Sequence, residues 1–409
     1  MRALTLAFAV FFSACQPSSS TDGGAGGAGG VGAGGGSGGG GGGGVGVGGG
    51  AAGGGMGGGS VGGGSAGGTG GGGGGGVDSG VVLPPACAGS QVLALTRQGH
   101  TVYVTVTVGS SPQTGSGPFL IDFATNFSAV DLSALSGPGP AYSGCQPDAG
   151  NTNACTFTDL DFFGSWGSVT LYPEDFSYLS LTPPQAGIIG TDFLSVHPFT
   201  VDYRGAQLIQ GANNAFCSDD ELWDAGFGPL ATDGFFTSDY ANLKPLTDVD
   251  SMATPGQYTV PDVPTVPVRL AGIDALAQLD TGFNDVVHRH SINVNQALVN
   301  AVLSAHPNAL LRDSSLDLTL STCVGASEPV QAYRLAPGSS FDFVMPDGGA
   351  ARSSADALIY AKDTPMAAKV CGGIGTWTVP AAQVAGSFYD DDQVVVFDPI
   401  RSRVWIPRR

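Results

Sequence analysis

Basic residues are scarce in this sequence. The 409 residues include 15 Lys and Arg against 34 Asp and Glu, so the formal net charge is −19 at pH 7, and no block of basic residues occurs. Because nucleic acid phosphates are bound by Lys and Arg, this composition excludes nucleic acid as the main partner.

Metal-binding patterns are also lacking. No two of the seven cysteines form a Cys-x-x-Cys pair, and the only close histidines are His288 and His290. Structural zinc sites normally draw on such pairs. We therefore expect no metal site and no cofactor, and we interpret the two histidines as neighbours on one face of a strand or loop.

Glycine is abundant but unevenly distributed, because 40 of the 69 glycines fall within residues 21–80. Residues 22–76 offer almost no side chains to bury against the ordering entropy, so we expect disorder there. A flexible chain of about 60 residues has an end-to-end distance of roughly 40–45 Å. We interpret the segment 15–80 as a tether. An adhesive low-complexity segment is the alternative, although nothing periodic supports it.

Residues 1–14 have the layout of a secretory signal peptide: one early charge, Arg2, and then an apolar run too short to span a bilayer as a helix. Residues 12–15 (Phe-Ser-Ala-Cys) resemble a bacterial lipobox, although Phe stands where Leu is usual. The resemblance implies lipidation of Cys15 and attachment to a membrane, and Gln16 favours the outer membrane or cell surface. A plain signal peptide, giving a secreted or periplasmic protein, is the alternative.

The remaining 329 residues have the pattern of a mostly β protein. Short alternating apolar stretches, bounded by Gly, Pro, Asn and Asp, predict short strands. The clearest are 101–108, 168–172, 265–270, 316–320 and 393–397. One helix is predicted over Val294–Ala305. Six cysteines remain after Cys15, and this even number in an exported protein suggests three disulfides, with 15 possible connectivities.

An internal repeat divides this unit into two related halves. In each half a glycine is followed twelve residues later by an aspartate (190 and 202, 386 and 398), with apolar residues at matched offsets before the acid. Each half also contains two strands, the second of which ends at an acid, Asp122 or Asp280. A duplicated β unit predicts a pseudo-twofold molecule with these two acids near its axis.

The strongest short motif is Leu279-Asp280-Thr281-Gly282. Together with Asp122 and the segment 187–190 (Gly-Ile-Ile-Gly), it resembles the pepsin-like and retropepsin-like aspartic proteases over about 91–407. The resemblance implies a monomer with a bilobal pepsin-like acid-protease fold. We expect the N-terminal β lobe over 83–212, an inter-lobe connection over 213–254 that matches neither copy, and the C-terminal β lobe over 255–409.

The resemblance also implies roles for individual residues. The catalytic pair would be Asp122 and Asp280, supported by Thr125, Thr281 and Gly282, and the flap hairpin would include Phe163, Gly164 and Trp166. The pair Cys323–Cys371 is similar to the family's C-lobe disulfide. We favour Cys145–Cys155 as the second pair, which leaves Cys87–Cys217 by elimination.

The activity implied by the resemblance is that of an aspartic endopeptidase acting on a protein or peptide substrate. Two carboxyls close together cannot both ionise cheaply and therefore share one proton. The ionised carboxyl takes a proton from a water molecule that attacks the peptide carbonyl, while the protonated carboxyl donates to the developing oxyanion. The pair titrates as a unit, so activity is expected in a limited and usually acidic pH window.

The first acidic turn departs from the family pattern. Phe123 lacks the hydroxyl expected after the aspartate, Ala124 replaces a glycine, and Phe163 stands where the flap tyrosine is expected. A catalytically inactive pepsin-like pseudo-protease, acting as a peptide-binding or structural surface module, is therefore the alternative to the enzyme. A surface adhesin or coat component is a third interpretation.

The other acids are expected to be structural. Asp202 and Asp398 are interpreted as turn residues that close the last strand pair of each half. The run Asp390-Asp391-Asp392 lacks the alternating ligand spacing of a calcium loop, so we expect it on a solvated face.

Overall fold

The structure is a computed structural model, and it describes residues 81–87, 89, 91–125, 128–147, 153–179, 181–212, 216–232, 263, 265–285, 288, 290–321, 326–371 and 373–409. The predicted signal peptide, Cys15 and the glycine-rich tether lie outside the described residues. Within them the protein is mostly β, as predicted. None of the helices in this described part is both long and apolar enough to cross a membrane.

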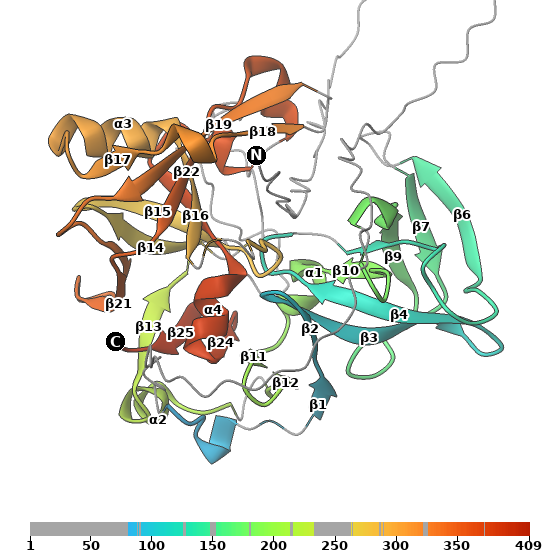
Figure 1. The fold of residues 1–409 in the computed structure, drawn as a ribbon. Coiled ribbons are helices and arrows are strands. Elements are labelled where there is room, and N and C mark those ends of the chain that lie inside the picture. The colour runs from blue at the N-terminus through green and yellow to red at the C-terminus, as the bar shows by residue number, and fades with distance from the viewer. Residues whose placement is uncertain are drawn as a thin grey trace, which may run out of the picture.

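The first half forms a sheet in the order β2-β3-β4-β10-β5-β9-β7-β6, with β8 paired to β3. It lies on the right in Figure 1. Its strands are β2 (Thr96–Gln98), β3 (Thr101–Ser110), β4 (Gln113–Ile121), β5 (Ala129–Val130), β6 (Tyr142–Pro147), β7 (Asn153–Phe157), β8 (Leu160–Asp161), β9 (Val169–Pro173) and β10 (Gly187–Ile189).

The second half forms a sheet in the order β17-β19-β22-β16-β23-β15-β14-β20-β21, with β18 paired to β19. It lies on the upper left in Figure 1 and carries helix α3. Its strands are β14 (Thr265–Leu270), β15 (Ile273–Leu279), β16 (Ser291–Asn295), β17 (Leu310–Arg312), β18 (Leu318–Ser321), β19 (Ser327–Leu335), β20 (Phe341–Val344), β21 (Ala350–Ser354), β22 (Leu358–Lys362) and β23 (Ala381–Val384).

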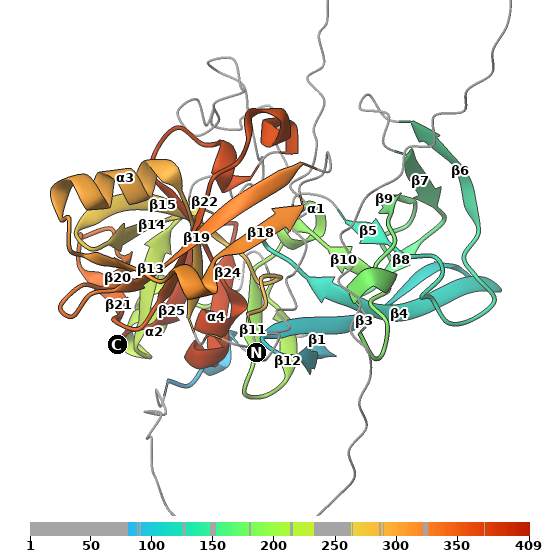
Figure 2. The same cartoon turned by 45° about the horizontal axis from the view of Figure 1, so that its top comes forward.

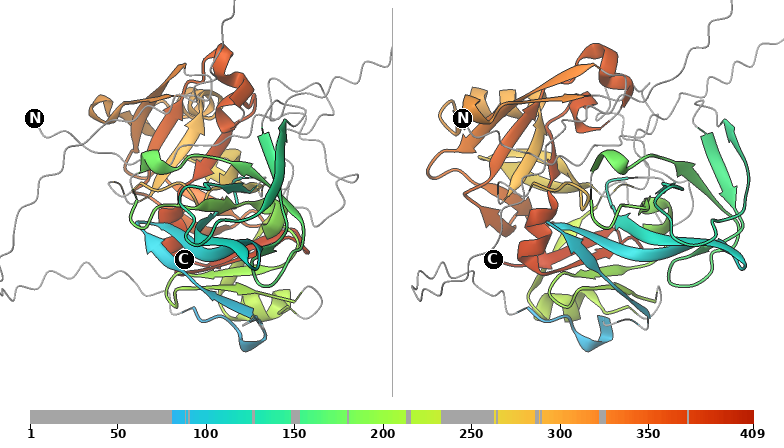
Figure 3. Two further views of the ribbon diagram at one scale, coloured as in Figure 1. Left: turned by 90° about the vertical axis from the view of Figure 1, so that its right-hand side faces the viewer. Right: turned by 45° about the vertical axis from the view of Figure 1, so that its right-hand side comes forward.

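A third sheet combines strands of both halves in the order β1-β12-β11-β24-β25-β13. Figure 1 shows it beneath the other two sheets, and Figures 2 and 3 show the three sheets from other directions. Its strands are β1 (Gln91–Ala94), β11 (Phe199–Asp202), β12 (Gln207–Gln210), β13 (Phe227–Ala231), β24 (Val394–Asp398) and β25 (Arg403–Pro407). Strands β11 and β24 pair antiparallel across its centre, Phe199 with Phe397 and Val201 with Val395. Thr200 and Val396, which stand at the same offset before Asp202 and Asp398, lie directly opposite each other.

The helices are short and lie between strands. They are α1 (Thr191–Leu194), α2 (Asp219–Asp224), α3 (Gln296–Ala305) and α4 (Gly386–Asp392), with single 3₁₀ turns at Pro85–Cys87, Ser177–Leu179, Ser314–Leu316, Met366–Cys371 and Ile374–Thr376. The predicted helix at 294–305 is α3, which begins two residues later because the Asn295 side chain accepts a hydrogen bond from the Leu298 amide and caps it.

The same local topology surrounds the strand before each acid. Strand β4 ends at Ile121 and runs parallel to β10, which pairs antiparallel with β5. Strand β15 ends at Leu279 and runs parallel to β23, which pairs antiparallel with β16. Asp122 and Asp280 therefore leave equivalent strands in the two halves.

The segment 213–254 is predicted to connect the lobes and to match neither copy of the repeat. Its described part, residues 216–232, contains a strand of the third sheet. Strand β13 pairs with β25 at one edge of the third sheet, as β1 pairs with β12 at the other edge. These residues therefore supply a counterpart of the first strand of the repeat. The correspondence of β13 to β1 was not visible in the sequence, because the two strands share their place in the sheet and not their residues.

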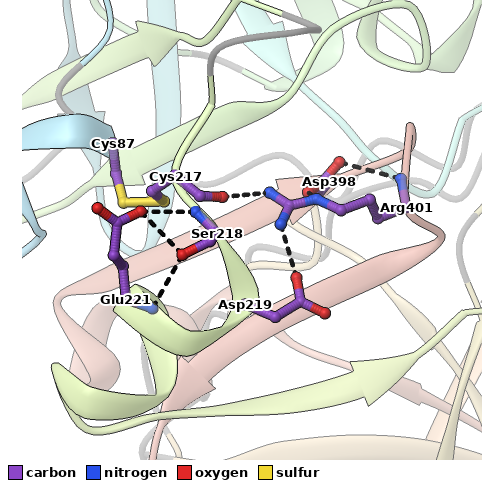
Figure 4. Close-up of a disulfide and its surroundings, with 7 residues drawn as sticks. All are labelled: Cys87, Cys217, Ser218, Asp219, Glu221, Asp398 and Arg401. Atoms are coloured by element: carbon purple, nitrogen blue, oxygen red, sulfur yellow. Dashed lines mark hydrogen bonds and ion pairs between the residues drawn. A yellow bond between two sulfur atoms is a disulfide. The ribbon is translucent and has the colours of Figure 1, made fainter.

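The predicted disulfide Cys87–Cys217 is present and ties the first turn to α2 (Figure 4). Next to it, Arg401 donates to the Cys217 carbonyl, to Asp219 and to Asp398, each at 2.6 Å. The fully buried Asp398 also accepts from the Arg401 amide, and Asp202 accepts from the Gly205 amide at 2.7 Å, so each acid ends its strand and binds the backbone of the turn that follows.

The other two predicted disulfides are only partly within the described residues. Cys155 is disulfide-bonded, but the side chain of its predicted partner, Cys145, lies outside the described residues. Cys323 and the side chain of Cys371 also lie outside them.

Replacing Cys87 and Cys217 together by serine is expected to lower the free energy of unfolding by roughly 3–5 kcal/mol, because the bond closes a loop with a sequence separation of 130 residues. Urea unfolding of the double variant and of the native chain measures the difference. The double substitution isolates this bond, whereas a reductant would also open the one at Cys155. Equal unfolding midpoints would contradict the expectation.

Candidate active site

The two strand-terminal acids are buried at equivalent positions. Asp122 is 8% exposed and Asp280 is 4% exposed. The Asp122 amide donates to the Ile189 carbonyl at 3.0 Å, and the Asp280 amide donates to the Val384 carbonyl at 3.1 Å. Each acid is therefore anchored by the neighbouring parallel strand of its own half, β10 or β23.

Donors within its own half reach both oxygens of each carboxylate. Asp122 accepts from the Ala124 amide at Oδ1 (2.8 Å) and from the Thr125 hydroxyl at Oδ2 (2.7 Å). Asp280 accepts from the Gly282 amide at Oδ1 (2.8 Å) and from Gln383 Nε2 at Oδ2 (2.6 Å). The amide donors are equivalent in the two turns, but the second donors are not.

The two acidic turns meet at Gly282. A Cβ atom at this position would lie 2.9 Å from Asp122 Oδ2 and 3.2 Å from Leu120 Cδ2. The distance to Asp122 is shorter than Cβ contacts in proteins. The Gly282 amide is also hydrogen-bonded to both carboxyls. The structure therefore brings Asp122 and Asp280 to the two sides of one glycine, and any side chain there would push the turns apart.

Thr281 links the turns through its hydroxyl, which is completely buried. It donates to the Ile121 carbonyl at 2.7 Å and accepts from the Phe123 amide at 3.1 Å. The predicted role of Thr281 at the base of the site agrees with these contacts. Phe123 has no hydroxyl that could form an equivalent bond to the second turn. Its ring stacks on Phe397 of the third sheet, with ring centroids 3.6 Å apart and planes inclined by 6°.

Burial and mutual repulsion perturb both acids. Burial raises the pKa of Asp122, and the hydrogen bonds from Ala124 and Thr125 oppose the rise. Burial raises the pKa of Asp280 well above its usual value, and the negative charge of Asp122 raises it further. Two such carboxyls lose their protons in separate steps, so over an intermediate pH range the pair holds one proton and one negative charge.

The structure packs the expected flap residues against aromatic side chains of the first half. The Phe163 ring packs against Phe199 of β11 at a centroid distance of 5.8 Å, and the Trp166 ring packs edge-on against Phe193 of α1 at 4.7 Å. Gly164 lies between them with a φ of 119°. Phe163 and Gly164 lie in the tight turn closed by the antiparallel bridge between Asp161 and Ser165.

Local turn chemistry explains this placement. The Asp159 carboxylate accepts hydrogen bonds from the Ser165 hydroxyl and from the Gly167 amide, both at 2.8 Å. A longer hairpin in this region is formed by β6 and β7. Its connecting residues 148–152 lie outside the described residues.

The expectation of a solvated face for residues 390–392 is wrong. Asp390 contacts Arg97 at 2.5 Å and His100 at 2.9 Å, which both belong to the first half. The Asp392 side chain is completely buried and contacts Arg352 at 2.6 Å and Arg409 at 2.9 Å. Sequence reasoning missed these pairs because the partners lie 17 to about 290 residues away in the chain.

The third acid of the run, Asp391, contacts one of the two close histidines. His290 Nε2 lies 2.5 Å from Asp391, and His290 Nδ1 lies 2.8 Å from Asp356. Among the residues that the structure describes, no group of three or more His, Cys, Asp and Glu side chains is arranged to hold a metal ion.

Gln383 is the one contact of the acids that sequence reasoning missed. It occupies the position in β23 that corresponds to Ile188 in β10, because the next residue of each strand, Ile189 or Val384, accepts the amide of the acid. A signal was present: Thr125 lies three residues after Asp122, whereas Phe283, which has no hydroxyl, lies three residues after Asp280.

Comparisons with known proteins show little similarity. No protein-family model matches the chain, and the search of curated proteins found no match. Among solved structures, the chain is similar to one described as "Crystal structure of edgp", with 13% sequence identity and a TM-score of 0.41 over 80% of this chain and 96% of that one.

Thr281→Val is expected to lower the free energy of unfolding by roughly 2–4 kcal/mol, because it removes both hydrogen bonds and leaves the Phe123 amide and the Ile121 carbonyl buried without this partner. Chemical denaturation measures the loss. Thr105→Val, at an exposed position of β3, is the matched control and is expected to change stability by less than about 0.5 kcal/mol. Equal effects of the two substitutions would contradict the linking role.

Proposed function

We propose that this protein is an aspartic endopeptidase with a bilobal pepsin-like arrangement, in which Asp122 and Asp280 form the catalytic pair. One observation carries the proposal: two buried carboxyls leave equivalent strands of the two halves and lie on either side of Gly282. The same topology around both strands supports the arrangement. The substrate would be a protein or peptide.

The perturbed acidities suggest a division of roles. Asp280, whose pKa is raised further by the charge of its neighbour, holds the shared proton, and Asp122 carries the negative charge. Asp122 takes a proton from a water molecule as its oxygen attacks the peptide carbonyl, and Asp280 gives its proton to the carbonyl oxygen. The resulting diol intermediate then collapses as the C–N bond breaks, Asp122 gives its proton to the leaving amine, and Asp280 takes back a proton from a hydroxyl of the diol.

A second candidate function is peptide binding without cleavage. The observation that favours it is that the two turns are linked from one side only. The Thr281 hydroxyl is hydrogen-bonded to the first turn, whereas Phe123 has no hydroxyl to bond to the second turn. In such a pseudo-protease the same pair of acids would remain buried but would not activate water. The two candidates differ in their response to substitution of either acid.

Asp122→Asn and Asp280→Asn are each expected to reduce cleavage of a denatured protein substrate by on the order of a thousandfold or more, because each removes half of the proton-sharing pair. Cleavage is measured between pH 2 and 7, with and without a statine-type inhibitor. Asp202→Asn, which changes a turn aspartate outside the pair, is the matched control and should retain activity. Absence of cleavage by the folded native protein would rule out the enzyme.

A stability measurement tests the acid pair even without activity. Because the pKa values of both acids are raised in the folded state, their ionisation costs stability, which is lost as pH rises from the unfolded pKa through the folded pKa. Asp280→Asn is therefore expected to raise the free energy of unfolding at pH 7 by about 1 kcal/mol or more, and not at pH 3. A destabilised variant at pH 7 would contradict the close pairing of the acids.

We also propose that the protein is exported and held at a membrane through a lipid on Cys15, with the glycine-rich segment as a tether. The lipobox-like residues 12–15 support this proposal. Cys15→Ser is expected to move the protein from the membrane pellet to the soluble fraction of the producing cell, because one substitution removes the attachment point. Cys87→Ser is the control, since its thiol is bonded to Cys217. Unchanged membrane partition of the Cys15 variant would contradict the anchor.

A further inference from the structure

The two acids of the pair receive their second hydrogen bond from different kinds of donor. In the first half, the donor is the Thr125 hydroxyl, three residues after Asp122, at 2.7 Å. In the second half the residue at that position is Phe283, which is completely buried and has no donor in its side chain. Gln383 Nε2 reaches Asp280 Oδ2 at 2.6 Å from the neighbouring strand β23.

Gln383 is held in one orientation. It is 6% exposed, and its Oε1 accepts a hydrogen bond from Asn293 Nδ2 at 3.3 Å. Asn293 is itself 3% exposed and lies directly opposite Gln383 in the register of β16 and β23. Since Asn293 uses the oxygen of the Gln383 amide, the NH₂ group points at Asp280, and this group can only donate.

We propose that Gln383 is a positioning residue that holds the Asp280 carboxyl from the neighbouring strand and favours its ionised form. This inference rests on the proposed function. The NH₂ group can only donate, so its bond to Oδ2 is strongest when Asp280 is ionised. The Gly282 amide donates to the other oxygen, Oδ1, next to Asp122, and Gln383 is therefore the side-chain donor that completes the anchoring of Asp280.

Other charged or titratable groups near Asp280 do not perform this task. The negative charge of Asp122 opposes ionisation of Asp280. The positive charge of Lys362 in β22 favours ionisation of Asp280 from a distance. The Lys362 ammonium lies 3.2 Å from Glu328, which offsets its charge. The hydroxyl of Tyr389 in α4 donates to the Val384 carbonyl at 3.3 Å. Gln383 is thus the side chain whose donor contacts Oδ2.

The test is Gln383→Met, which keeps the side-chain length and removes the donor. The ionised form of Asp280 loses a hydrogen bond, so the high-pH limb of the kcat/KM profile is expected to move up by about one pH unit. We expect kcat to fall about tenfold with KM unchanged, because Gln383 is buried behind the carboxylate. Gln185→Met, at a buried glutamine that contacts the Tyr103 hydroxyl at 3.3 Å, is the matched control and should leave the limb in place.

A rescue experiment separates positioning from packing. Adding Phe283→Ser to Gln383→Met places a hydroxyl three residues after Asp280, as Thr125 lies after Asp122, and is expected to return the high-pH limb toward its original position. If Gln383→Met does not fold, Gln383→Glu replaces it. A protonated Glu can donate as Gln does, so activity should persist at low pH and disappear as this carboxyl ionises.

The outcomes distinguish this inference from the proposed function. If Asp280→Asn abolishes cleavage but Gln383→Met leaves the profile unchanged, Gln383 has no positioning role and the protease proposal stands. If the native protein cleaves nothing, the protease proposal fails. The role of Gln383 can then still be tested by ¹³C NMR titration of the aspartate carboxyls, in which Asp280→Asn identifies the Asp280 signal. An Asp280 titration that does not move in Gln383→Met overturns the inference.

Discussion

The arrangement of the site depends on the hydroxyl of Thr281. Its two hydrogen bonds cross from the second half to the backbone on both sides of Asp122, at Ile121 and Phe123. They hold the turns so closely that residue 282 has no room for a side chain. Without this link, two carboxyls that repel each other would separate. The stacking of Phe123 on Phe397 supplies, by burial against the third sheet, the support that a second hydroxyl would otherwise give.

Scarce cations hold distant segments of the chain together. Arg97 of the first half contacts Asp390 in α4, and Arg401 connects the last strand pair to α2 and to the Cys87–Cys217 disulfide. Arg352 and Arg409 neutralise the buried Asp392. A buried carboxylate is costly unless it is paired, so a chain with 34 acids and 15 bases places several of its bases where acids enter the interior. Helix α4 follows the strand that flanks Asp280, and these pairs therefore also fix the back of the site.

The sequence predicted features that depend on local pattern and on internal repetition. Alternating apolar stretches gave the strands, and matched offsets related Phe199 and Val201 to Val395 and Phe397. Asp280 and Thr281 followed from a four-residue motif, and Asp122 followed from the internal repeat. Features that depend on contacts between distant residues were not predictable: the pairs formed by residues 390–392, and the packing of Trp166 on α1. Gln383 was missed because its role is visible only when β23 is known to lie beside β15.

The two halves are related by repetition, yet the proposed chemistry requires their acids to behave differently. Two carboxyls in identical surroundings would share the charge equally, and neither would be fixed as acid or base. Here the surroundings differ: a hydroxyl bonds Asp122, and a buried amide held by Asn293 bonds Asp280. A hydroxyl can rotate and either donate or accept, whereas the amide NH₂ can only donate. The asymmetry therefore lies in the side chains around a symmetric backbone, and this permits one duplicated fold to give two identical residues different roles.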